Sequence, residues 1–336
     1  IMTMNRQITL ASRPVGAPTP DNFKLVETQV PTPERGQVLV KALYLSLDPY
    51  MRGRMSDAKS YAPSVQIGEV MTGGAVGRVD DSRHPGFKAG DIVEGRIGWQ
   101  EYGLVEGGML RKVDPDVAPI STALGVLGMP GLTAYFGLFE IGKPRPGETL
   151  VVSAASGAVG AVVCQLGKMA GARVVGIAGG PDKCAYVKEA LGVDAVIDYK
   201  AEKDLSKALA AACPDGIDVY FDNVGGPVTD AIANLFNLRA RMIVCGLISH
   251  YNMPDGYVGP SILRSVLTNR VTIQGMIVFD WHDRWPAGVA QLGKLVKAGK
   301  LTYKEDVTEG LENAPATFIG MLEGKNFGKT LVKIAE

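Results

Sequence analysis

The segment over residues 150–160, with the sequence LVVSAASGAVG, has residue types suited to binding a phosphate-bearing ligand. An apolar run enters a turn of small residues, and apolar residues at helical spacing follow from Val159 onward. Small side chains let the backbone approach a pyrophosphate, and a helix N-terminus offers unpaired N–H groups and a positive dipole end. The turn matches the last two glycines of the G-x-G-x-x-G fingerprint, Gly157 and Gly160, but carries Ala155 at the first. Alone it fits an ordinary strand-to-helix turn equally well; the strands and helices that follow favour a dinucleotide site.

The end of the next apolar run indicates which dinucleotide would bind. Sites for NAD usually place Asp or Glu there to hold the ribose hydroxyl, but residues 174–180 read VVGIAGG and contain no acid. Lys183 follows, and its charge suits a 2′-phosphate, although Asp182 stands beside it. By spacing alone, Lys183 could equally be a solvated lysine in the first turn of a helix. The sequence therefore favours NADP(H) over NAD(H).

The pattern of apolar runs changes near residue 126. Up to residue 125 the runs are short and are cut by Gly and Pro, which is typical of a mostly β, barrel-like domain. Beyond it, apolar strands alternate with helical patterns, which predicts a parallel sheet of the doubly wound α/β type. We expect strands at 150–154, 173–178, 195–198, 217–221 and 241–245, with helices at 158–170, 182–191, 203–212 and 228–236. After about residue 300 the pattern is short and mixed again.

Composition excludes several classes of function. Lys plus Arg equals Asp plus Glu at 35 each, which argues against a nucleic-acid or anionic-membrane partner. The four cysteines show no C-x-x-C spacing and the three histidines are far apart, so we expect no protein-built metal site. Scattered cysteines and the lack of an apolar leader predict a cytoplasmic protein. Residues 149–167 carry no charge, but glycines interrupt them, so we predict a buried strand, turn and helix and no membrane span.

Five stretches carry a resemblance to a known family. They are LSLDPYMRGRM at 45–55, LGMPGLTAY at 127–135, YFDNVGG at 220–226, CGLISHYN at 245–252 and NFGK at 326–329. Together they resemble the zinc-independent double-bond reductase branch of the medium-chain dehydrogenase/reductase superfamily, which includes prostaglandin/leukotriene reductases and bacterial curcumin reductases. The likeness spans nearly the whole chain. Zinc-using relatives carry Gly-His-Glu near Gly68-Glu69, where the histidine is absent here.

This resemblance implies a GroES-like β-barrel substrate domain over residues 1–125, a Rossmann NADPH-binding domain over 126–299, and a return to the first domain over 300–336. It implies NADPH-dependent reduction of the C=C bond of α,β-unsaturated ketones or aldehydes, with hydride added at the β-carbon and a proton at the α-carbon. Two alternatives stay open: an NADPH:quinone reductase, and a non-catalytic NADPH-binding protein that senses redox state.

The resemblance also implies roles for particular residues. Tyr251 would donate a hydrogen bond to the developing enolate oxygen, with the nicotinamide ribose hydroxyl as the competing donor. Tyr50 and Tyr61 would line the substrate pocket, although each tyrosine could be an ordinary half-buried aromatic. The cofactor would contact Gly157, Ala158, Val159, Gly160, Lys183, Tyr199, Asn223, Cys245, Gly246, Leu247, Ile248, Ser249, Met276, Ile277, Val278 and Asn326. Cys245 fits a small apolar spacer better than a nucleophile, because no histidine base is placed beside it by sequence.

A homodimer is expected by analogy, since family members commonly pair through the edges of their Rossmann sheets. Residues 270–278 have the pattern of a late strand that could form such an edge. The alternative is an internal strand of a monomer.

Overall fold

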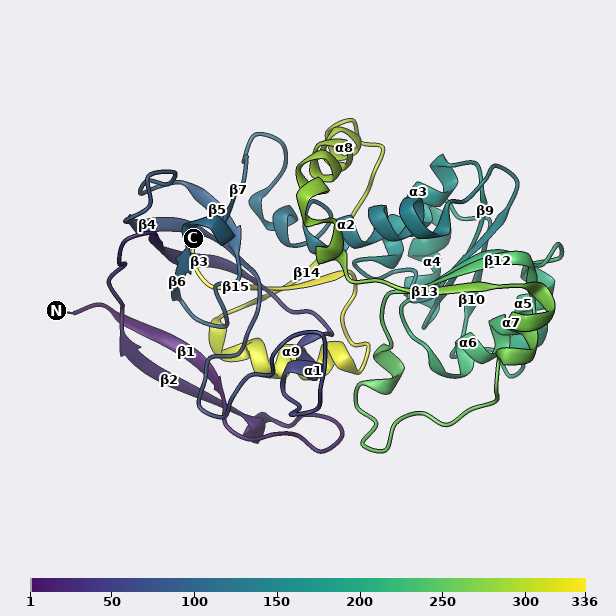
Figure 1. Ribbon diagram of the computed structural model, residues 1–336, viewed down its shortest axis with the longest axis horizontal. Helices are drawn as coiled ribbons and strands as arrows, with labels where there is room; N and C mark the ends of the chain where they lie inside the picture. Colours follow the sequence, from purple (N-terminus) through teal and green to yellow (C-terminus); the bar gives the residue numbers. More distant parts are fainter. Residues whose placement is uncertain (1) are drawn as a thin grey trace. The chain divides into compact units, whose positions relative to one another are not determined.

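A computed structural model describes residues 2–336 and divides the chain into two compact units (Figure 1). The first unit comprises the residues up to Gly125 together with Glu305–Glu336, and the second comprises Val126–Lys304. No helix within residues 2–336 has the length and apolar character needed to span a membrane.

The first unit is built on a seven-stranded sheet around the long strand β3. The sheet has the order β14-β15-β3-β4-β5-β7, with β6 also paired to β3, and β1 and β2 form a separate antiparallel pair. Gly77 allows the close approach of β4 to β3, because a Cβ there would lie 2.3 Å from the Lys41 carbonyl oxygen. The elements are β1 (Met4–Leu10), β2 (Phe23–Gln29), β3 (Gln37–Ser46), α1 (Met51–Arg54), β4 (Ala75–Ser82), β5 (Ile92–Gly95), β6 (Tyr102–Glu106), β7 (Arg111–Lys112), β14 (Glu305–Glu309), α9 (Ala314–Leu322) and β15 (Lys329–Lys333).

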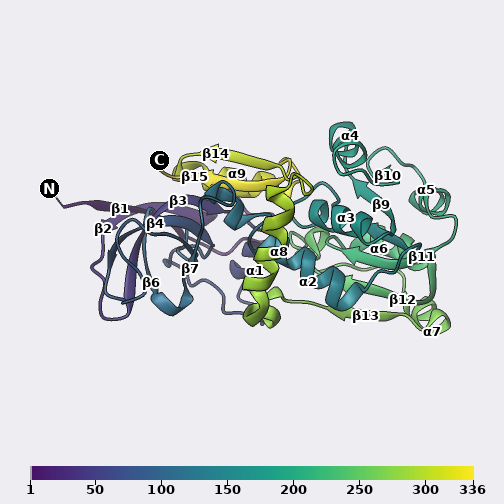
Figure 2. The same cartoon turned by 90° about the horizontal axis from the view of Figure 1, so that it is seen from above.

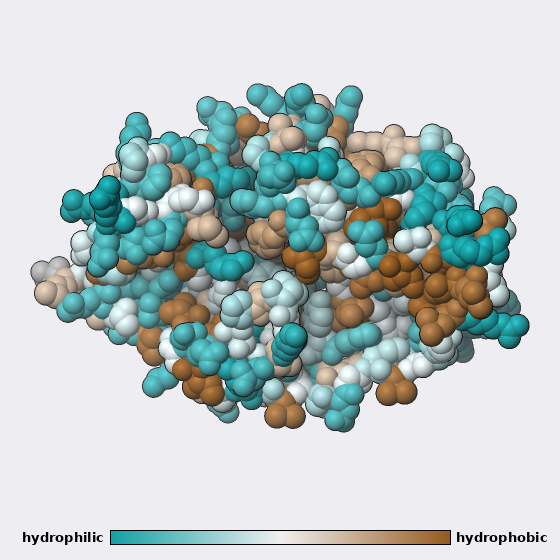
Figure 3. Space-filling view, in the orientation of Figure 1, coloured by the Kyte–Doolittle hydropathy of each residue, from teal (hydrophilic) through white to brown (hydrophobic). Residues whose placement is uncertain are grey.

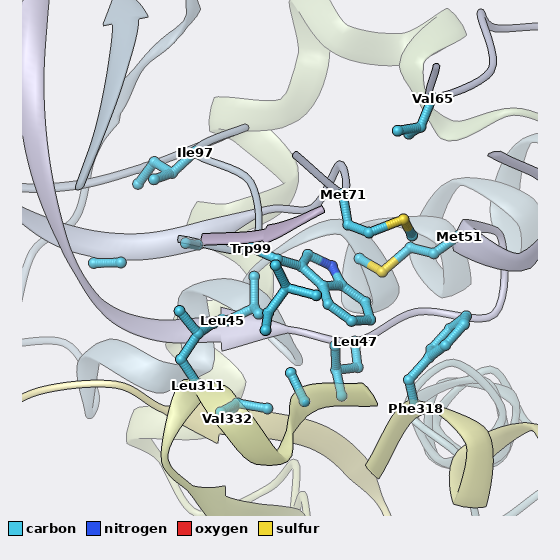
Figure 4. Close-up of a cluster of buried hydrophobic side chains, with 14 of the residues drawn as sticks. Leu45, Leu47, Met51, Val65, Met71, Ile97, Trp99, Leu311, Phe318 and Val332 are labelled. Atoms are coloured by element: carbon cyan, nitrogen blue, oxygen red, sulfur yellow. The ribbon is translucent and has the colours of Figure 1, made fainter. Parts of the chain in front are cut away.

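The core of this unit surrounds Trp99, whose indole is fully buried. The indole stacks on Phe23 at 5.6 Å between ring centroids and meets the edge of Phe318 at 5.5 Å. Figure 4 shows Met51 and Met71 beside the indole, with Phe318 of α9 nearby. The segment after Gly310 therefore supplies side chains to a core that otherwise comes from residues 8–110.

The second unit contains a six-stranded parallel sheet with the order β10-β9-β8-β11-β12-β13. Seen from above in Figure 2, the labels run from β10, near α4 and α5, to β13, near α7. The strands are β8 (Thr149–Val152), β9 (Arg173–Ala178), β10 (Ala195–Asp198), β11 (Ile217–Asp222), β12 (Phe236–Val244) and β13 (Thr272–Gly275). The helices are α2 (Met129–Phe136), α3 (Gly160–Met169), α4 (Pro181–Glu189), α5 (Leu205–Ala212), α6 (Gly226–Ala233), α7 (Leu263–Asn269) and α8 (Trp285–Lys297).

This architecture confirms the predicted fold class, a mixed α/β protein with a parallel-sheet Rossmann domain and a separate sheet domain. The strand order reverses between β8 and β11, and open α/β sheets bind ligands at the carboxyl ends of strands beside such a point. A ligand of the second unit is therefore expected to bind where β8 and β11 end.

Candidate functional site

The turn that joins β8 to α3 is shaped by its small residues. Ala154 adopts a left-handed conformation with φ of 47°, and the Gly157 N–H donates to the Ala154 carbonyl at 3.0 Å. A Cβ on Gly160 would lie 2.2 Å from the same carbonyl oxygen, so that position requires glycine. Residues 157–159 remain half-buried at the start of α3. A turn of small residues at a helix N-terminus fits a pyrophosphate.

Gly176 of the neighbouring strand explains why the first fingerprint glycine can be replaced by Ala155. A Cβ on Gly176 would lie 3.0 Å from the Cβ of Ala155 and 2.7 Å from a methyl group of Val187. The methyl group of Ala155 therefore fits because the residue it packs against, Gly176, has no side chain. The fingerprint departs from its usual form in sequence but keeps its close packing.

The turn after β9 carries the residues predicted to hold a 2′-phosphate. Gly180, with φ of 97°, precedes α4, and half-buried Lys183 lies in the first turn of that helix. Tyr199 follows β10, and its ring lies so close to Gly179 that a Cβ there would be 2.8 Å away. The Asp198 carboxylate holds the two turns together, because one oxygen accepts hydrogen bonds from the Gly180 and Lys200 N–H groups, both at 3.0 Å.

Lys200 is a cation at this turn that the sequence analysis missed. Its Cε would lie 2.9 Å from a Cβ on Gly179, on the same side as the Tyr199 ring. The available signal was its position directly after Tyr199, at the carboxyl end of a parallel strand.

A buried carboxylate, Asp222, organises the end of β11. It accepts hydrogen bonds from the hydroxyls of Tyr220, Ser153 and Thr229 and from the N–H groups of Val224 and Gly225, at 2.7–3.3 Å. Burial, followed by the charge of Asp222, raises the pKa of the Tyr220 hydroxyl well above its usual value. No role was predicted for Asp222, because the sequence does not show which groups would donate hydrogen bonds to an acid at the end of a strand.

Asn223 is fixed beside this carboxylate by the β8 turn. Its backbone N–H donates to the Ser153 hydroxyl at 2.9 Å, and its amide donates to the Ser153 carbonyl at 2.8 Å. The predicted cofactor contact Asn223 is therefore held against the segment that leads into Gly157–Gly160.

The predicted nicotinamide loop lies across the connection between β11 and α6. Backbone N–H groups of Cys245 and Gly246 donate to the Asp222 carbonyl at 2.9 and 3.2 Å, and that of Ile248 donates to the Asn223 carbonyl at 3.3 Å. The Ser249 hydroxyl donates to the Val224 carbonyl at 2.6 Å. Burial, followed by the charge of Asp222, raises the pKa of the Cys245 thiol to about 12, so the thiol stays protonated.

Two side chains complete this loop. The Tyr251 hydroxyl oxygen accepts a hydrogen bond from the Leu247 N–H at 3.1 Å. His250 accepts one at Nε2 from the Gly226 N–H at 3.1 Å, and its ring stacks on Tyr257 with 5.0 Å between centroids. The end of the loop is thereby attached to the first residue of α6.

Residues 276–278 follow β13, the next strand of the sheet. The Met276 N–H donates to the Val244 carbonyl at 3.1 Å, which places these residues beside the start of the loop. The Met276 side chain is buried, and its sulfur would lie 2.6 Å from a Cβ on Gly137. Any contact of Met276 with a cofactor would therefore use its backbone.

The remaining predicted residues, Tyr50, Tyr61 and Asn326, belong to the first unit. The guanidinium of Arg54 lies over both tyrosine rings, 5.6 Å from the centroid of Tyr50 and 4.4 Å from that of Tyr61. Asn326 stands in the turn before β15, where its amide donates to the Gly328 carbonyl at 2.9 Å. Arg54 was not among the predicted site residues, although it lies within the stretch LSLDPYMRGRM.

Residues 2–336 contain no group of three or more His, Cys, Asp or Glu side chains able to hold a metal ion. The second unit does assemble a glycine turn at a helix N-terminus, two lysines in the turns after β9 and β10, and a loop that presents its backbone. Together they fit a phosphorylated dinucleotide.

Comparison with known proteins identifies relatives along the whole chain. Residues 6–113 match a family model described as the N-terminal domain of oxidoreductase, and residues 158–294 match one described as zinc-binding dehydrogenase. The chain is 52% identical to the NADPH-dependent curcumin reductase of Escherichia coli, over 98% of this chain and 97% of that protein. It is 42% identical to the NADP(+)-dependent 2-alkenal reductase of Nicotiana tabacum, over 98% of each chain.

Solved structures agree with these matches. CurA from Vibrio vulnificus, in complex with NADPH, is 50% identical and superposes with a TM-score of 0.94 over 98% of this chain and 99% of that chain. Escherichia coli quinone oxidoreductase complexed with NADPH, at 20% identity, shares the fold with a TM-score of 0.78 over 98% of this chain and 100% of that chain.

Proposed function

Because this chain belongs to the medium-chain dehydrogenase/reductase superfamily, we propose that it is an NADPH-dependent reductase of C=C bonds conjugated to a ketone or aldehyde. The observation that carries the proposal is the full-length identity to reductases of curcumin and 2-alkenals, joined to a second unit whose β8 turn fits a dinucleotide. Curcumin-type enones and alkenals are the substrates this relationship favours.

NADPH, when bound, supplies a hydride for the β-carbon of the enone. The chain must then stabilise charge on the carbonyl oxygen and provide a proton at the α-carbon. Tyr251 is our candidate donor to that oxygen, because it ends the loop that Asp222 and Asn223 hold at the carboxyl edge of the sheet. Lys183, Tyr199 and Lys200 would bind the 2′-phosphate and give preference for NADPH over NADH.

We also propose that the protein forms a homodimer through β13, the strand at one edge of the six-stranded sheet. All four residues of β13 are exposed, and Leu263 and Leu267 of the adjacent α7 are 70% and 76% exposed. Figure 3 shows a brown, apolar area where Figure 1 places α7. A second copy paired edge to edge would cover this area. Light scattering should then give twice the 35.6 kDa mass, and a monomer mass at every concentration would refute this part.

We further propose that the protein acts in the cytoplasm, since its four free thiols suit a reducing compartment.

The activity is tested by mixing the protein with NADPH and a panel of enones, enals, quinones and simple alcohols, and following the loss or gain of NADPH absorbance. Reduction of enones and enals is the expected result. Turnover of quinones alone would favour the related quinone reductases. Tight NADPH binding with no turnover of any acceptor would favour a redox sensor.

A further inference from the structure

Arg54 is a buried cation in the first unit, with 6% of its surface exposed. It ends the short helix α1, and its guanidinium lies over the rings of Tyr50 and Tyr61. The Arg54 carbonyl accepts a hydrogen bond from the Val65 N–H at 2.8 Å. This bond holds the end of the loop that carries Tyr61 against the helix. Within residues 2–336, no hydrogen bond or ion pair engages its guanidinium.

The acidic side chains near Arg54 in sequence have other partners. Asp48 forms a buried ion pair with Lys329 at 2.7 Å and also accepts a hydrogen bond from the Ser46 hydroxyl. Asp57 lies 3.6 Å from Arg13. No carboxylate of α1 or its flanks is left to balance the charge of Arg54.

The tyrosines supply no counter-charge either. Burial, followed by the charge of Asp48, raises the pKa of Tyr50 above its usual range, so its phenol is neutral at physiological pH. The Tyr50 phenol therefore adds no negative charge beside Arg54.

Arg52, two residues earlier on the same helix, shows how a buried arginine is accommodated when its role is structural. It is 8% exposed, and its guanidinium donates to the Gly16 carbonyl at 2.8 and 3.3 Å. Arg54 lacks such a partner, and none of its guanidinium nitrogens is among the fully buried polar atoms without a hydrogen bond, so they remain accessible to a ligand. The tyrosine rings contact the faces of the guanidinium, so its N–H groups, which lie in the plane, stay available as donors. Their fork geometry matches a carboxylate.

We propose that Arg54 binds a carboxylate of the substrate, so that the preferred enones carry an acidic group remote from the double bond. This inference rests on the proposed reductase activity, because it specifies which enones that activity favours. The aromatic walls of Tyr50 and Tyr61 would contact the apolar body of such a substrate, and the guanidinium would hold its charged end.

The test uses the NADPH-loaded protein and one enone in two forms, 4-(3-oxobut-1-enyl)benzoic acid and its methyl ester. The wild-type protein should show the higher kcat/KM for the acid. Arg54→Gln should lower kcat/KM for the acid about tenfold or more, mainly through KM, and change the ester by no more than about twofold. Arg54→Lys, which keeps the charge but loses the fork, should fall between them.

Arg52→Gln is the matched control, since it removes a buried arginine from the same helix. It should lower thermal stability and affect acid and ester by the same factor. Equal losses for both substrates in Arg54→Gln, or no wild-type preference for the acid, would overturn the proposal.

Calorimetric titration of the NADP⁺-loaded protein with the saturated acid, 4-(3-oxobutyl)benzoate, separates this inference from the proposed activity. Binding that is lost in Arg54→Gln would support carboxylate recognition even if no enone were reduced. Binding that is the same in both proteins would refute it even if neutral enones were good substrates.

Discussion

The Tyr251 hydroxyl oxygen accepts a hydrogen bond from the backbone N–H of Leu247, four residues earlier in the same loop. The loop therefore fixes the position of the phenol from within. Hydrogen bonds in a chain strengthen one another, so a phenol that accepts from an N–H is a better donor to a developing negative charge.

Tyr251→Phe should lower kcat by about 10²–10³, because it removes a donor to the enolate oxygen, and should leave the affinity for NADPH unchanged. Steady-state kinetics with an enone and fluorescence titration with NADPH measure the two effects. Tyr257→Phe is the matched control, since Tyr257 lies in the same segment as Tyr251 and its hydroxyl bonds Asp230 of α6. This variant should retain most of the activity. Full activity of Tyr251→Phe would assign the donor role to the ribose hydroxyl or to water.

Lys183→Ala should raise KM for NADPH about tenfold or more and change KM for NADH little, because only NADPH carries the 2′-phosphate. Lys200→Ala should act in the same direction. Lys188→Ala is the control on the same helix, because its ammonium donates to the Val193 and Asp194 carbonyls. Equal changes for both cofactors would show that neither lysine binds the 2′-phosphate.

The strands of the second unit could be predicted because each is a short, apolar run between helical patterns. Strands β9 and β10 have the bounds expected from the sequence, Arg173–Ala178 and Ala195–Asp198. Strand β12 begins at Phe236 and not at residue 241. It contains an irregularity at Arg239, with a φ of 63°, where the pairing with β11 shifts in register. Strand β13 is limited to Thr272–Gly275, within the run of 270–278. Such irregularities depend on neighbouring strands and leave no periodic signal.

The parts of the site that could not be predicted depend on contacts between distant residues. The close packing of Ala155 against Gly176 requires the β8–β9 register. The five donors to Asp222 come from one strand, two turns and a helix. The position of Arg54 between two tyrosines depends on how the loop after α1 returns. Sequence shows the residue types in each case, but not which of them meet.

Gly176→Ala should destabilise the protein by about 1–3 kcal/mol, because the added methyl group would overlap Ala155 and Val187. Denaturant unfolding measures the loss. Combining it with Ala155→Gly should recover part of the stability, and a coupling energy near zero would show that the two positions do not share the same space.

Cys245→Ala should keep activity within about twofold, because a thiol with a pKa of about 12 is not a nucleophile near neutral pH. Cys184 and Cys245 are both half-buried, and the pKa of about 12 at Cys245 predicts that alkylation of the intact protein modifies Cys184 first. Mass spectrometry of peptides checks the order. Inactivation by Cys245→Ala with NADPH binding retained would instead indicate a chemical role.

The Arg241 guanidinium, which donates to both carboxylate oxygens of Glu148 at 2.7 and 2.9 Å, holds the pKa of that acid below its usual value. A pKa lowered by folding stabilises the protein above the unfolded-state pKa, and this contribution disappears as pH falls through the folded value. Glu148→Gln should therefore cost about 1 kcal/mol at neutral pH, and the difference from wild type should shrink as the pH falls below the ordinary Glu pKa of about 4.3. Glu323→Gln, at an exposed pair with Lys325, should cost less at every pH.

The division of the first unit between the two ends of the chain determines the order in which the protein can be completed during synthesis. Val126–Lys304 leaves the ribosome before β15 exists to pair with β3 through Leu331 and Ser46. Until then the Trp99 core also lacks Phe318 and Val332. The nucleotide-binding unit is therefore the first that can fold fully, and the unit that begins the chain is finished last.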